Sequence, residues 1–546
     1  MATISKRYAR LRNALALGLA LTGGVGAQAE TIQVTNPIAG NVTWRSTNEY
    51  VLNGFIYVLT NSVLNIEPGT VIRGRAGTGL DSAALLVTQG AKIFANGTAH
   101  SPIIFTAEAD DLSDPNDIPL YTRQLWGGVV IFGRAGLNTS TDAVGNTTTP
   151  KYDIYEGLPD TQINGQYVNR FGGADDDDNS GVFRYVSIRY SSTVILPNKE
   201  INALSLAAVG RGTKIENVEC FDAGDDAVEF FGGTVNTKYL ASIFSDDDNF
   251  DIDQGFRGKN QFWFALQAPD KKDNGGEWNG EPSGIAVGNA PIGNFEIYNA
   301  TYIGAGTNTT GARAFIVREN AAPKVFNSIV TEFNAGLNID AKSGAHFTNG
   351  LAKFQHNIFW NFASNGVAQP YWQNATAEWV LTNAANDNLF VDPMLMDISR
   401  TNEPRFGLDP RPQAGSPALS SPLSAPNDGF YTPVNYRGAF GDVNWLSDWG
   451  FAAECGLITA AGAGTPAALV GGIAPAQPTL SIVNLGTGSV ELSWPTESGF
   501  SYQVQTKTNL EDAWTDAGAA IPGTGGAVTS AQAIGGSTGY FRVRAQ

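Results

Sequence analysis

The chain has 546 residues, of which 63 are Gly and only 16% are charged. This length is too great for one compact domain and is normal for an elongated repeat fold with an appended module. With 34 basic and 52 acidic residues the formal charge is −18, which argues against nucleic acid as a partner because phosphate binding needs clustered Lys and Arg.

The first 29 residues have the organisation of a secretory signal peptide. Four basic residues precede the apolar run Ala14–Val25, and Ala27–Ala29 (AQA) matches a cleavage site. A membrane anchor is the alternative, but this run falls well short of the roughly 20 residues that span a bilayer. No later segment is long and apolar enough to be transmembrane. We therefore expect a protein that is secreted or displayed on the outer surface of a bacterium.

Residues 30–456 contain short strand-like runs separated by Gly-, Asn- and Asp-rich turns. Among these runs are the phrases Asn65–Ile72 (NIEPGTVI), Gly90–Ile93 (GAKI), Ser101–Thr106 (SPIIFT), Trp126–Ile131 (WGGVVI) and Phe230–Thr234 (FFGGT). These phrases resemble those of secreted bacterial right-handed parallel β-helix proteins, which share a pectate-lyase-like solenoid. The resemblance covers most of 31–451 and implies fold and export. It implies no particular activity, because most members have no assigned reaction.

Ile201–Gln267 repeats at a step of about 22 residues, which is typical of a solenoid whose coils stack on one another. The step aligns three apolar ladders: Leu206, Val228 and Phe250; Ala208, Phe230 and Ile252; Val218, Leu240 and Phe262. It also places Glu216 beside Lys238. The fold class we predict is all-β, a right-handed parallel β-helix with coils of about 22 residues.

The same step predicts a ridge of carboxylates. It brings Asp225 near Asp247 and Asp226 near Asp248 on adjacent coils, with Asp251 close by. Strands about 4.8 Å apart would leave two full charges repelling by roughly 3 kcal/mol at an effective dielectric of about 20. Ca²⁺ would relieve that repulsion, since it is bound by carboxylate oxygens. Backbone N–H groups in turns would also relieve it, and both interpretations stay open. Asp176 and Asp178, in the cluster 175–178, form a second metal-site candidate.

A catalytic hypothesis competes for these residues. Gly224–Asp226 (GDD) resembles the paired carboxylates of polygalacturonases, although the His- and Arg/Lys-containing companion motifs of that family are absent. Lyases of this fold use Ca²⁺ and an Arg or Lys base on a neighbouring coil, and Arg257 is one available residue. Asp225, Asp226 and Arg257 are therefore the candidates for a polysaccharide lyase or glycoside hydrolase.

Lys271–Gly280 is predicted to be a polar insertion that carries Trp278. Together with Trp263 it would present a sugar-stacking surface, and a loop folded on the side of the solenoid is the alternative. Residues 376–451 are predicted to close the stack, with the aromatic segment Trp445–Phe451 covering its open end. Cys220 and Cys455 are expected to be separate thiols many coils apart.

Residues 457–478 are rich in Ala, Gly and Pro and are predicted to be a linker. Residues 479–546 alternate as in a small β-sandwich and resemble fibronectin type III-like modules. The leading hypothesis is a non-catalytic extracellular scaffold or adhesin, with or without Ca²⁺, that binds a polysaccharide, a cell surface or a protein partner. The alternative is an enzyme that acts on an acidic polysaccharide.

Overall fold

The structure is a computed structural model. It describes residues 30–282, 288–307, 309–364, 367–368, 371–400, 407–420, 422–458, 480–485, 489–496, 501–507, 514–523, 526–533 and 540–545. The predicted signal peptide and most of the predicted linker lie outside these residues. The chain divides into a first unit that ends at Ala463 and a second that begins at Gly464, and each is described by itself.

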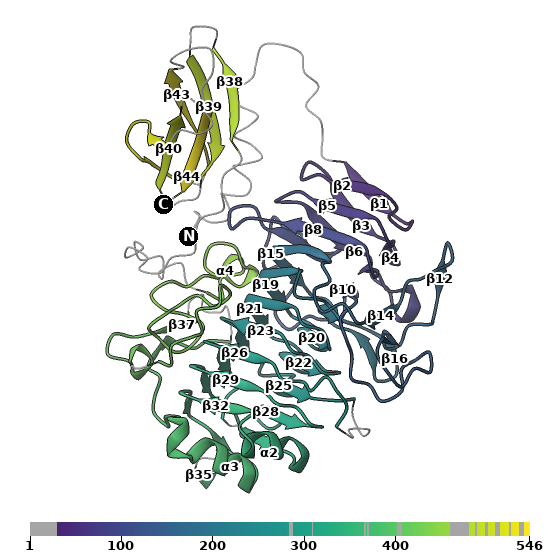
Figure 1. Cartoon of the computed structure of the whole chain (residues 1–546), viewed down its shortest axis with the longest axis vertical. Coiled ribbons are helices and arrows are strands. Elements are labelled where there is room, and N and C mark those ends of the chain that lie inside the picture. Colours follow the sequence, from purple (N-terminus) through teal and green to yellow (C-terminus); the bar gives the residue numbers. More distant parts are fainter. Residues whose placement is uncertain are drawn as a thin grey trace. The chain divides into compact units, whose positions relative to one another are not determined.

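The first unit is a parallel β-helix, as predicted (Figure 1). Face 1 is a nine-stranded sheet of parallel neighbours. Its strands, from one end of the stack to the other, are β4 (Phe55–Val58), β7 (Ala84–Val87), β10 (Val129–Phe132), β18 (Leu204–Ala207), β20 (Val228–Phe231), β22 (Phe250–Asp253), β25 (Asn274–Asn279), β28 (Arg313–Arg318) and β31 (Ala335–Ile339).

Faces 2 and 3 together form an 18-stranded sheet, in which the long strands contribute their first half to face 2 and their second half to face 3. The shared strands are β15 (Gly181–Arg189), β19 (Lys214–Phe221) and β21 (Asn236–Ile243). Face 2 also has β2 (Asn41–Trp44), β5 (Val63–Ile66), β8 (Lys92–Asn96), β23 (Lys259–Gln261), β26 (Glu296–Tyr298), β29 (Lys324–Phe326) and β32 (Lys353–Gln355). Face 3 adds β1 (Thr31–Val34), β3 (Glu49–Leu52), β6 (Val71–Gly74), β9 (Ile103–Ala107), β24 (Phe264–Leu266), β27 (Thr301–Ile303), β30 (Ile329–Thr331) and β33 (Ile358–Trp360).

A column of left-handed residues marks the corner between faces 2 and 3. In each coil from β15 onward, one residue has a φ between 47° and 60°, which breaks the strand direction without a loop. The residues are Tyr185, Asn217, Tyr239, Phe262, Asn299, Asn327 and His356. Because these coils turn at the same place, the strands on either side stay in register.

The apolar register differs from a uniform step at two coils. Val228 pairs with Phe250 and Glu216 with Lys238, as predicted, but Val228 pairs with Leu204 rather than with Leu206. The predicted first members of two ladders are therefore wrong, because the coil between Leu204 and Val228 is longer than the predicted step. A second departure has a greater consequence: Ala241 pairs with Phe264, which makes Phe262 a corner residue.

This coil is one residue longer than the predicted step. A shift of one residue exchanges the two faces of a strand, so the side chain of Trp263 points into the core. Trp263 is fully buried and stacks on Phe250 and Phe230, at 4.3 and 5.5 Å between ring centroids. Trp278 lies in β25, pairs with Ile252 and is also fully buried. The predicted sugar-stacking role of these two rings is therefore wrong, and Lys271–Gly280 contains a strand of face 1 rather than an insertion.

Hairpins and loops cover the first part of face 1. Residues 107–173 leave the solenoid on either side of β10, as expected. They form β11 (Lys151–Ile154) with β14 (Arg170–Gly173) and β12 (Gln162–Ile163) with β13 (Gln166–Tyr167), and β16 (Thr193–Leu196) pairs with β17 (Lys199–Ile201). Tyr155, Phe171 and Ile195 pack on the outward apolar side chains of face 1.

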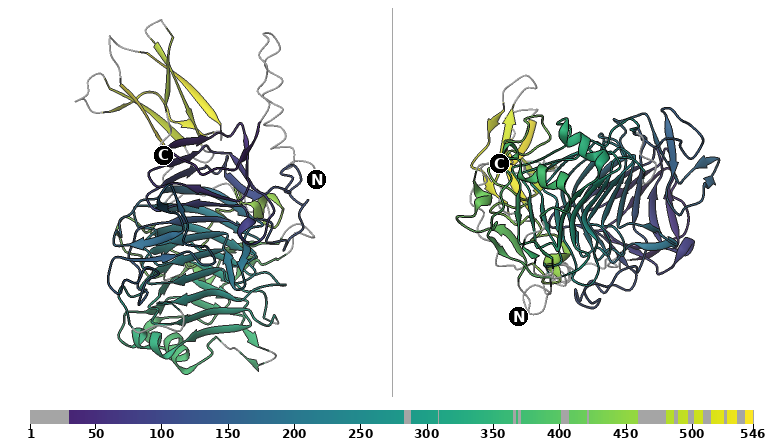
Figure 2. Two further views of the ribbon diagram at one scale, coloured as in Figure 1. Left: turned by 90° about the vertical axis from the view of Figure 1, so that its right-hand side faces the viewer. Right: turned by 90° about the horizontal axis from the view of Figure 1, so that it is seen from below.

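Two helices, not residues 445–451, lie at the end of the stack (Figures 1 and 2). They are α2 (Ala341–Thr348), capped by Asp340, and α3 (Ala375–Thr382), capped by Asn374, and both pack on the strands of the last coils. The remaining short elements of the first unit are η1 (Gly79–Asp81), β34 (Ala363–Ser364), β35 (Val367–Ala368), η2 (Ala384–Asn386), β36 (Leu395–Asp397), β37 (Asp409–Pro412) and η3 (Pro417–Leu419).

The segment after residue 389 then returns along face 3, which corrects its predicted place at the open end. It finishes in α4 (Phe451–Glu454), where Phe451 meets the rings of Tyr190 and Phe221. The buried Glu219 of β19 accepts hydrogen bonds from the N–H groups of Phe451 and Ala452, at 2.6 and 3.0 Å.

The same return places the two cysteines near each other along the stack. α4 packs on β19, which contains Cys220, and Cys455 follows α4 directly. Both cysteines are buried, free thiols. The expectation of two separate thiols is confirmed, but they are not many coils apart.

The second unit contains two small antiparallel sheets. One has β38 (Ser481–Asn484), β39 (Ser489–Pro495) and β43 (Ala527–Ala533), and the other has β40 (Ser501–Lys507), β41 (Thr515–Asp516), β42 (Ile521–Pro522) and β44 (Tyr540–Ala545). Leu492, Trp494, Tyr502 and Val504 share one buried cluster between the sheets, as in a sandwich. Among the described residues of the whole chain, no helix has the length and apolarity needed to cross a bilayer.

The buried position of Trp263 leads to a stability prediction. Trp263→Ala should lower the free energy of unfolding by about 3–5 kcal/mol, because it opens a cavity between stacked aromatic rings. The matched control is Trp379→Ala, since the side chain of Trp379 is 47% exposed. The effect of that control should stay within about 0.5 kcal/mol. Urea unfolding followed by far-UV circular dichroism measures both, and equal losses would contradict the assignment.

Candidate cation site

Carboxylate side chains gather at one part of face 1, and they come both from turns and from strands. The turns that enter β20, β22 and β25 supply Asp225, Asp226, Asp247, Asp248 and Asp273. The strands supply acidic side chains at alternate positions, because their apolar neighbours point into the core. In β20 the core residues Val228 and Phe230 flank Glu229, and in β22 Phe250 and Ile252 flank Asp251.

The coil register stacks these carboxylates directly. Glu229 pairs with Asp251, and Asp251 pairs with Glu277, so three acidic residues occupy the same position on three consecutive coils. In the preceding turns, the N–H of Asp248 donates to Oδ1 of Asp226 at 2.9 Å, and the N–H of Asp247 donates to the carbonyl oxygen of Asp225 at 3.4 Å. The predicted proximity of Asp225 to Asp247 and of Asp226 to Asp248 is confirmed.

Three overlapping groups result, and within each group one carboxylate oxygen per residue lies within 4.8 Å of the others. The groups are Asp225/Asp226/Asp247, Asp226/Glu229/Asp251 and Asp247/Asp248/Asp273. Asp226 and Asp247 each belong to two groups. Together with Glu277, which stacks on Asp251, these residues form one continuous band across the coils, which we call the acidic ladder.

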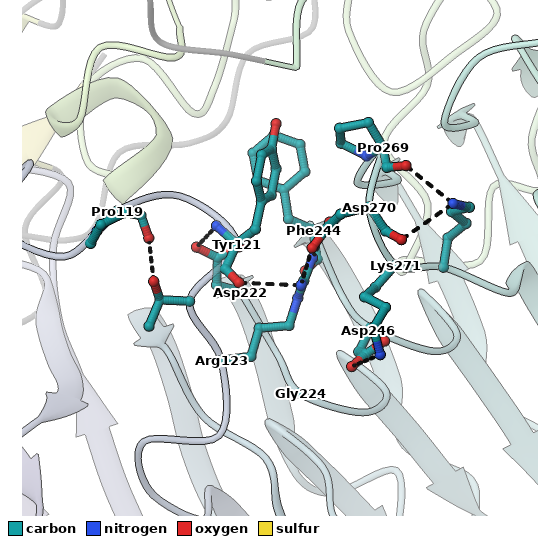
Figure 3. Close-up of polar contacts among 12 residues, drawn as sticks. Pro119, Tyr121, Arg123, Asp222, Gly224, Phe244, Asp246, Pro269, Asp270 and Lys271 are labelled. Atoms are coloured by element: carbon teal, nitrogen blue, oxygen red, sulfur yellow. Dashed lines mark hydrogen bonds and ion pairs between the residues drawn. The ribbon is translucent and has the colours of Figure 1, made fainter.

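Acidic residues beside the ladder have cationic partners (Figure 3). Arg123 makes a bidentate ion pair with Asp270 at 2.9 and 3.0 Å, and Lys271 lies 3.3 Å from Asp246. In contrast, no ion pair joins Asp225, Asp226, Glu229, Asp247, Asp248 or Asp251 to a Lys or Arg of the described residues. Among the described residues, Glu277 is the one member of the ladder that forms an ion pair, and its partner is Arg318.

Burial, reinforced by unpaired neighbouring carboxylates, raises the pKa values of several ladder residues. Burial, reinforced by the neighbouring Asp247, raises the pKa of Asp225 to about 8. Burial together with Asp273 and Glu277 raises the pKa of Asp247 to about 6. Burial also raises the pKa of Asp226, Glu229 and Asp251 well above their usual range, and neighbouring carboxylates add to the effect. The folded protein therefore favours protons, or another cation, at these positions.

Two buried oxygens with no hydrogen-bond donor lie at the second group. The side chain of Asn202 is fully buried, and its Nδ2 donates to Oε2 of Glu229 while its Oδ1 has no partner among the described residues. Oδ1 of Asp251 is likewise buried without a partner in the described part of the chain. Carboxylate and amide oxygens are the ligands that Ca²⁺ prefers, so the donor set fits a hard cation.

The chain was compared with known proteins. Residues 36–389 match the family model described as a pectate-lyase-like β-helix domain, which is more than half of the sequence. The chain belongs to this family. A search of the curated proteins found no match.

In this pectate-lyase-like β-helix, the weaker sequence candidates lie away from the acidic ladder. Arg257 forms an ion pair with Asp176 at 2.7 Å, in the turns that leave face 1 rather than in those that enter it. The predicted association of Arg257 with Asp225 and Asp226 is therefore wrong. Asp176 also lies 3.6 Å from Arg211, and Asp178 accepts from the N–H of Arg134, so these two residues have partners of their own.

Sequence reasoning missed several members of the ladder. Glu229 pairs with Asp251 at the predicted step, so that step would have found it. Glu277 and Asp273 were hidden because the coil between Asp251 and Glu277 is longer than the step. Asn202 carries no charge, and only its buried contact with Glu229 reveals it.

The raised pKa values predict how metal-free protein responds to pH. A carboxyl with a pKa of about 8 in the folded protein and about 4 in the unfolded chain keeps its proton longer when folded. Stability in EDTA should therefore fall as the pH rises from about 4 to about 8. Thermal melts of the wild type should show this fall, and Asp225→Asn should flatten it.

Asp177→Asn is the control, because Asp177 is an exposed acidic residue outside the ladder. It should keep the wild-type dependence on pH. A wild-type melting temperature that is constant or rising through that window in EDTA would contradict the electrostatic description.

Proposed function

We propose that this chain is a secreted or cell-surface β-helix protein whose acidic ladder binds Ca²⁺ and, through the bound cation, an acidic polysaccharide. It acts as a scaffold or adhesin rather than as an enzyme. One observation carries the proposal: carboxylates stack in register on three consecutive coils, and no Lys or Arg of the described residues pairs with Glu229 or Asp251.

The position of the ladder supports this role. Hairpins cover face 1 at β10 and β18, and the segment after residue 389 covers face 3. The hairpin cover reaches β20, where Phe231 packs on Tyr155 and Phe171 and Glu229 is buried, whereas Asp247 is exposed to solvent. A polymer lying across the coils would meet bound cations with unfilled coordination positions, because Ca²⁺ accepts six to eight oxygens.

Turn capping accounts for only part of the ladder. Oδ1 of Asp226 accepts from the N–H of Asp248, and Oδ1 of Asp248 accepts from the N–H of Asn274. Glu229 and Asp251 protrude from strands, away from the turn amides. Two carboxylates about 4.8 Å apart still repel by about 3 kcal/mol at an effective dielectric of about 20. A divalent cation removes this repulsion, and in metal-free protein protonation removes it as well, because the pKa values of Glu229 and Asp251 lie well above their usual range.

Calcium should raise the melting temperature of the wild type at pH 8 and low salt, and EDTA should reverse the increase, because an ion that binds only the folded state stabilises it. Tb³⁺ luminescence gives a direct measure of ion binding. The double variant Glu229→Gln/Asp251→Asn should lose most of both signals, and Asp177→Asn should retain them. Equal responses of the wild type and the double variant would refute binding at the ladder.

An enzyme is the second candidate, and a specific observation favours it. The pKa of Asp225 is about 8, so this carboxyl holds its proton near neutral pH in metal-free protein and would serve as a general acid. Asp226 and Asp247 lie within reach of it as second carboxylates. A glycoside hydrolase needs such a pair.

One experiment separates the two candidates. Mature protein is incubated with polygalacturonate and with neutral dextran, with and without Ca²⁺, and both retention and product formation are followed. We expect Ca²⁺-dependent retention of polygalacturonate, with no reducing ends and no unsaturated products. Turnover that Asp226→Asn abolishes would instead establish the enzyme, and Asp177→Asn controls for the loss of one charge.

A further inference from the structure

All the basic residues of 479–546 lie on two neighbouring strands. This stretch has three, Lys507, Arg542 and Arg544, against five acidic residues. Lys507 ends β40, and the two arginines lie in β44, which pairs with β40. The register places Gln505 opposite Arg542 and Lys507 opposite Tyr540.

The three cations share the outer face of their sheet. The alternate residues Tyr502, Val504 and Val543 are buried in the core of the sandwich. Side chains alternate across a strand, so Lys507, Arg542 and Arg544 point the other way. We call these three residues, with Trp514 and Tyr540, the basic face.

Aromatic rings organise the basic face. The guanidinium of Arg542 lies 4.6 Å from the ring of Trp514, and the ammonium of Lys507 lies 4.9 Å from the same ring. Lys507 is also 6.0 Å from the ring of Tyr540. Cation–π contacts of this kind restrict the two long side chains and hold two like charges side by side.

The arginines keep most of their donors available. Arg542 donates through Nε to Oε1 of Gln505 at 2.8 Å, and its other N–H groups and the whole of Arg544 have no ion pair within the described residues. The carboxylate of Asp516 is nearby but accepts from Gln505 at 2.7 Å. Guanidinium groups in this state match carboxylate and sulfate oxygens.

We propose that the basic face binds an acidic polysaccharide directly, without a metal ion. An acidic sugar combines a carboxylate or sulfate with an apolar ring face, which matches cations set among aromatic rings. A nucleic acid fits less well, because it needs more cations arranged along its backbone than this face offers. The site is independent of the acidic ladder and does not rest on the function proposed for it.

The test uses the full chain in EDTA, which removes any cation-bridged binding to the ladder. Polygalacturonate retention by the wild type should be measurable at low salt and fall steeply as salt is added, because exposed charges are screened. Arg542→Gln/Arg544→Gln should lose at least tenfold in affinity. Arg45→Gln/Arg75→Gln removes two exposed charges from the first unit and should bind as the wild type does.

Folding of the double variant is checked through its melting temperature and its Ca²⁺ response. A folded Arg542→Gln/Arg544→Gln protein that retains polygalacturonate in EDTA would overturn the proposal, and so would wild type that retains none. Equal retention of single-stranded DNA by the wild type would overturn the assignment to a glycan. The Tb³⁺ signal of the ladder should be the same in all these variants, so failure here leaves the calcium proposal standing.

Discussion

Parallel hydrogen bonding between successive coils is the constraint on which the rest of this structure depends. Once each coil pairs in register with the one before it, a residue type repeated at one position becomes a column. Apolar columns make the core, and left-handed residues make the corner between faces 2 and 3. Acidic columns are the costly case, because their members cannot move apart without breaking the backbone pairing that stacks them.

The chain deals with buried charge in two ways. Where a carboxylate anchors structure, it has partners: Glu219 accepts two backbone N–H groups of the returning segment, and Arg189 beside it pairs with Glu454 at 2.8 Å. Along the acidic ladder, Glu229 and Asp251 have no such cationic partner among the described residues. This contrast within one molecule distinguishes the ladder from an ordinary set of structural ion pairs.

The sequence was sufficient for the solenoid and for part of the ladder, because both follow from a regular step. The pairs Asp225/Asp247 and Asp226/Asp248 lie where that step remains true. The regular step gave wrong neighbours where a coil is longer than 22 residues. The lengthened coils that contain Trp263 and Trp278 turn both rings inward, and no local pattern marks these insertions.

The returning segment was also beyond sequence reasoning, for a different reason. Aromatic residues such as Trp445 and Phe451 suit any buried position. Composition therefore does not distinguish a segment that caps the end of the solenoid from one that covers its side. The place of Phe451 is set by Glu219 and Tyr190, which lie in the middle of the solenoid and far earlier in the chain.

The two proposed binding regions follow from the same principle of charge placement. The chain is acidic overall, so three basic residues gathered on one face of the second unit stand out against the charge of the rest. Once its carboxyl groups lose their protons, the bare ladder would repel an acidic polymer, whereas the basic face would attract it. Cations bound to the ladder would reverse the sign of that interaction locally, since each divalent ion brings positive charge and open coordination positions. Calcium would thus switch the first unit from repelling an acidic polymer to binding it. The second unit would bind the same polymer without calcium.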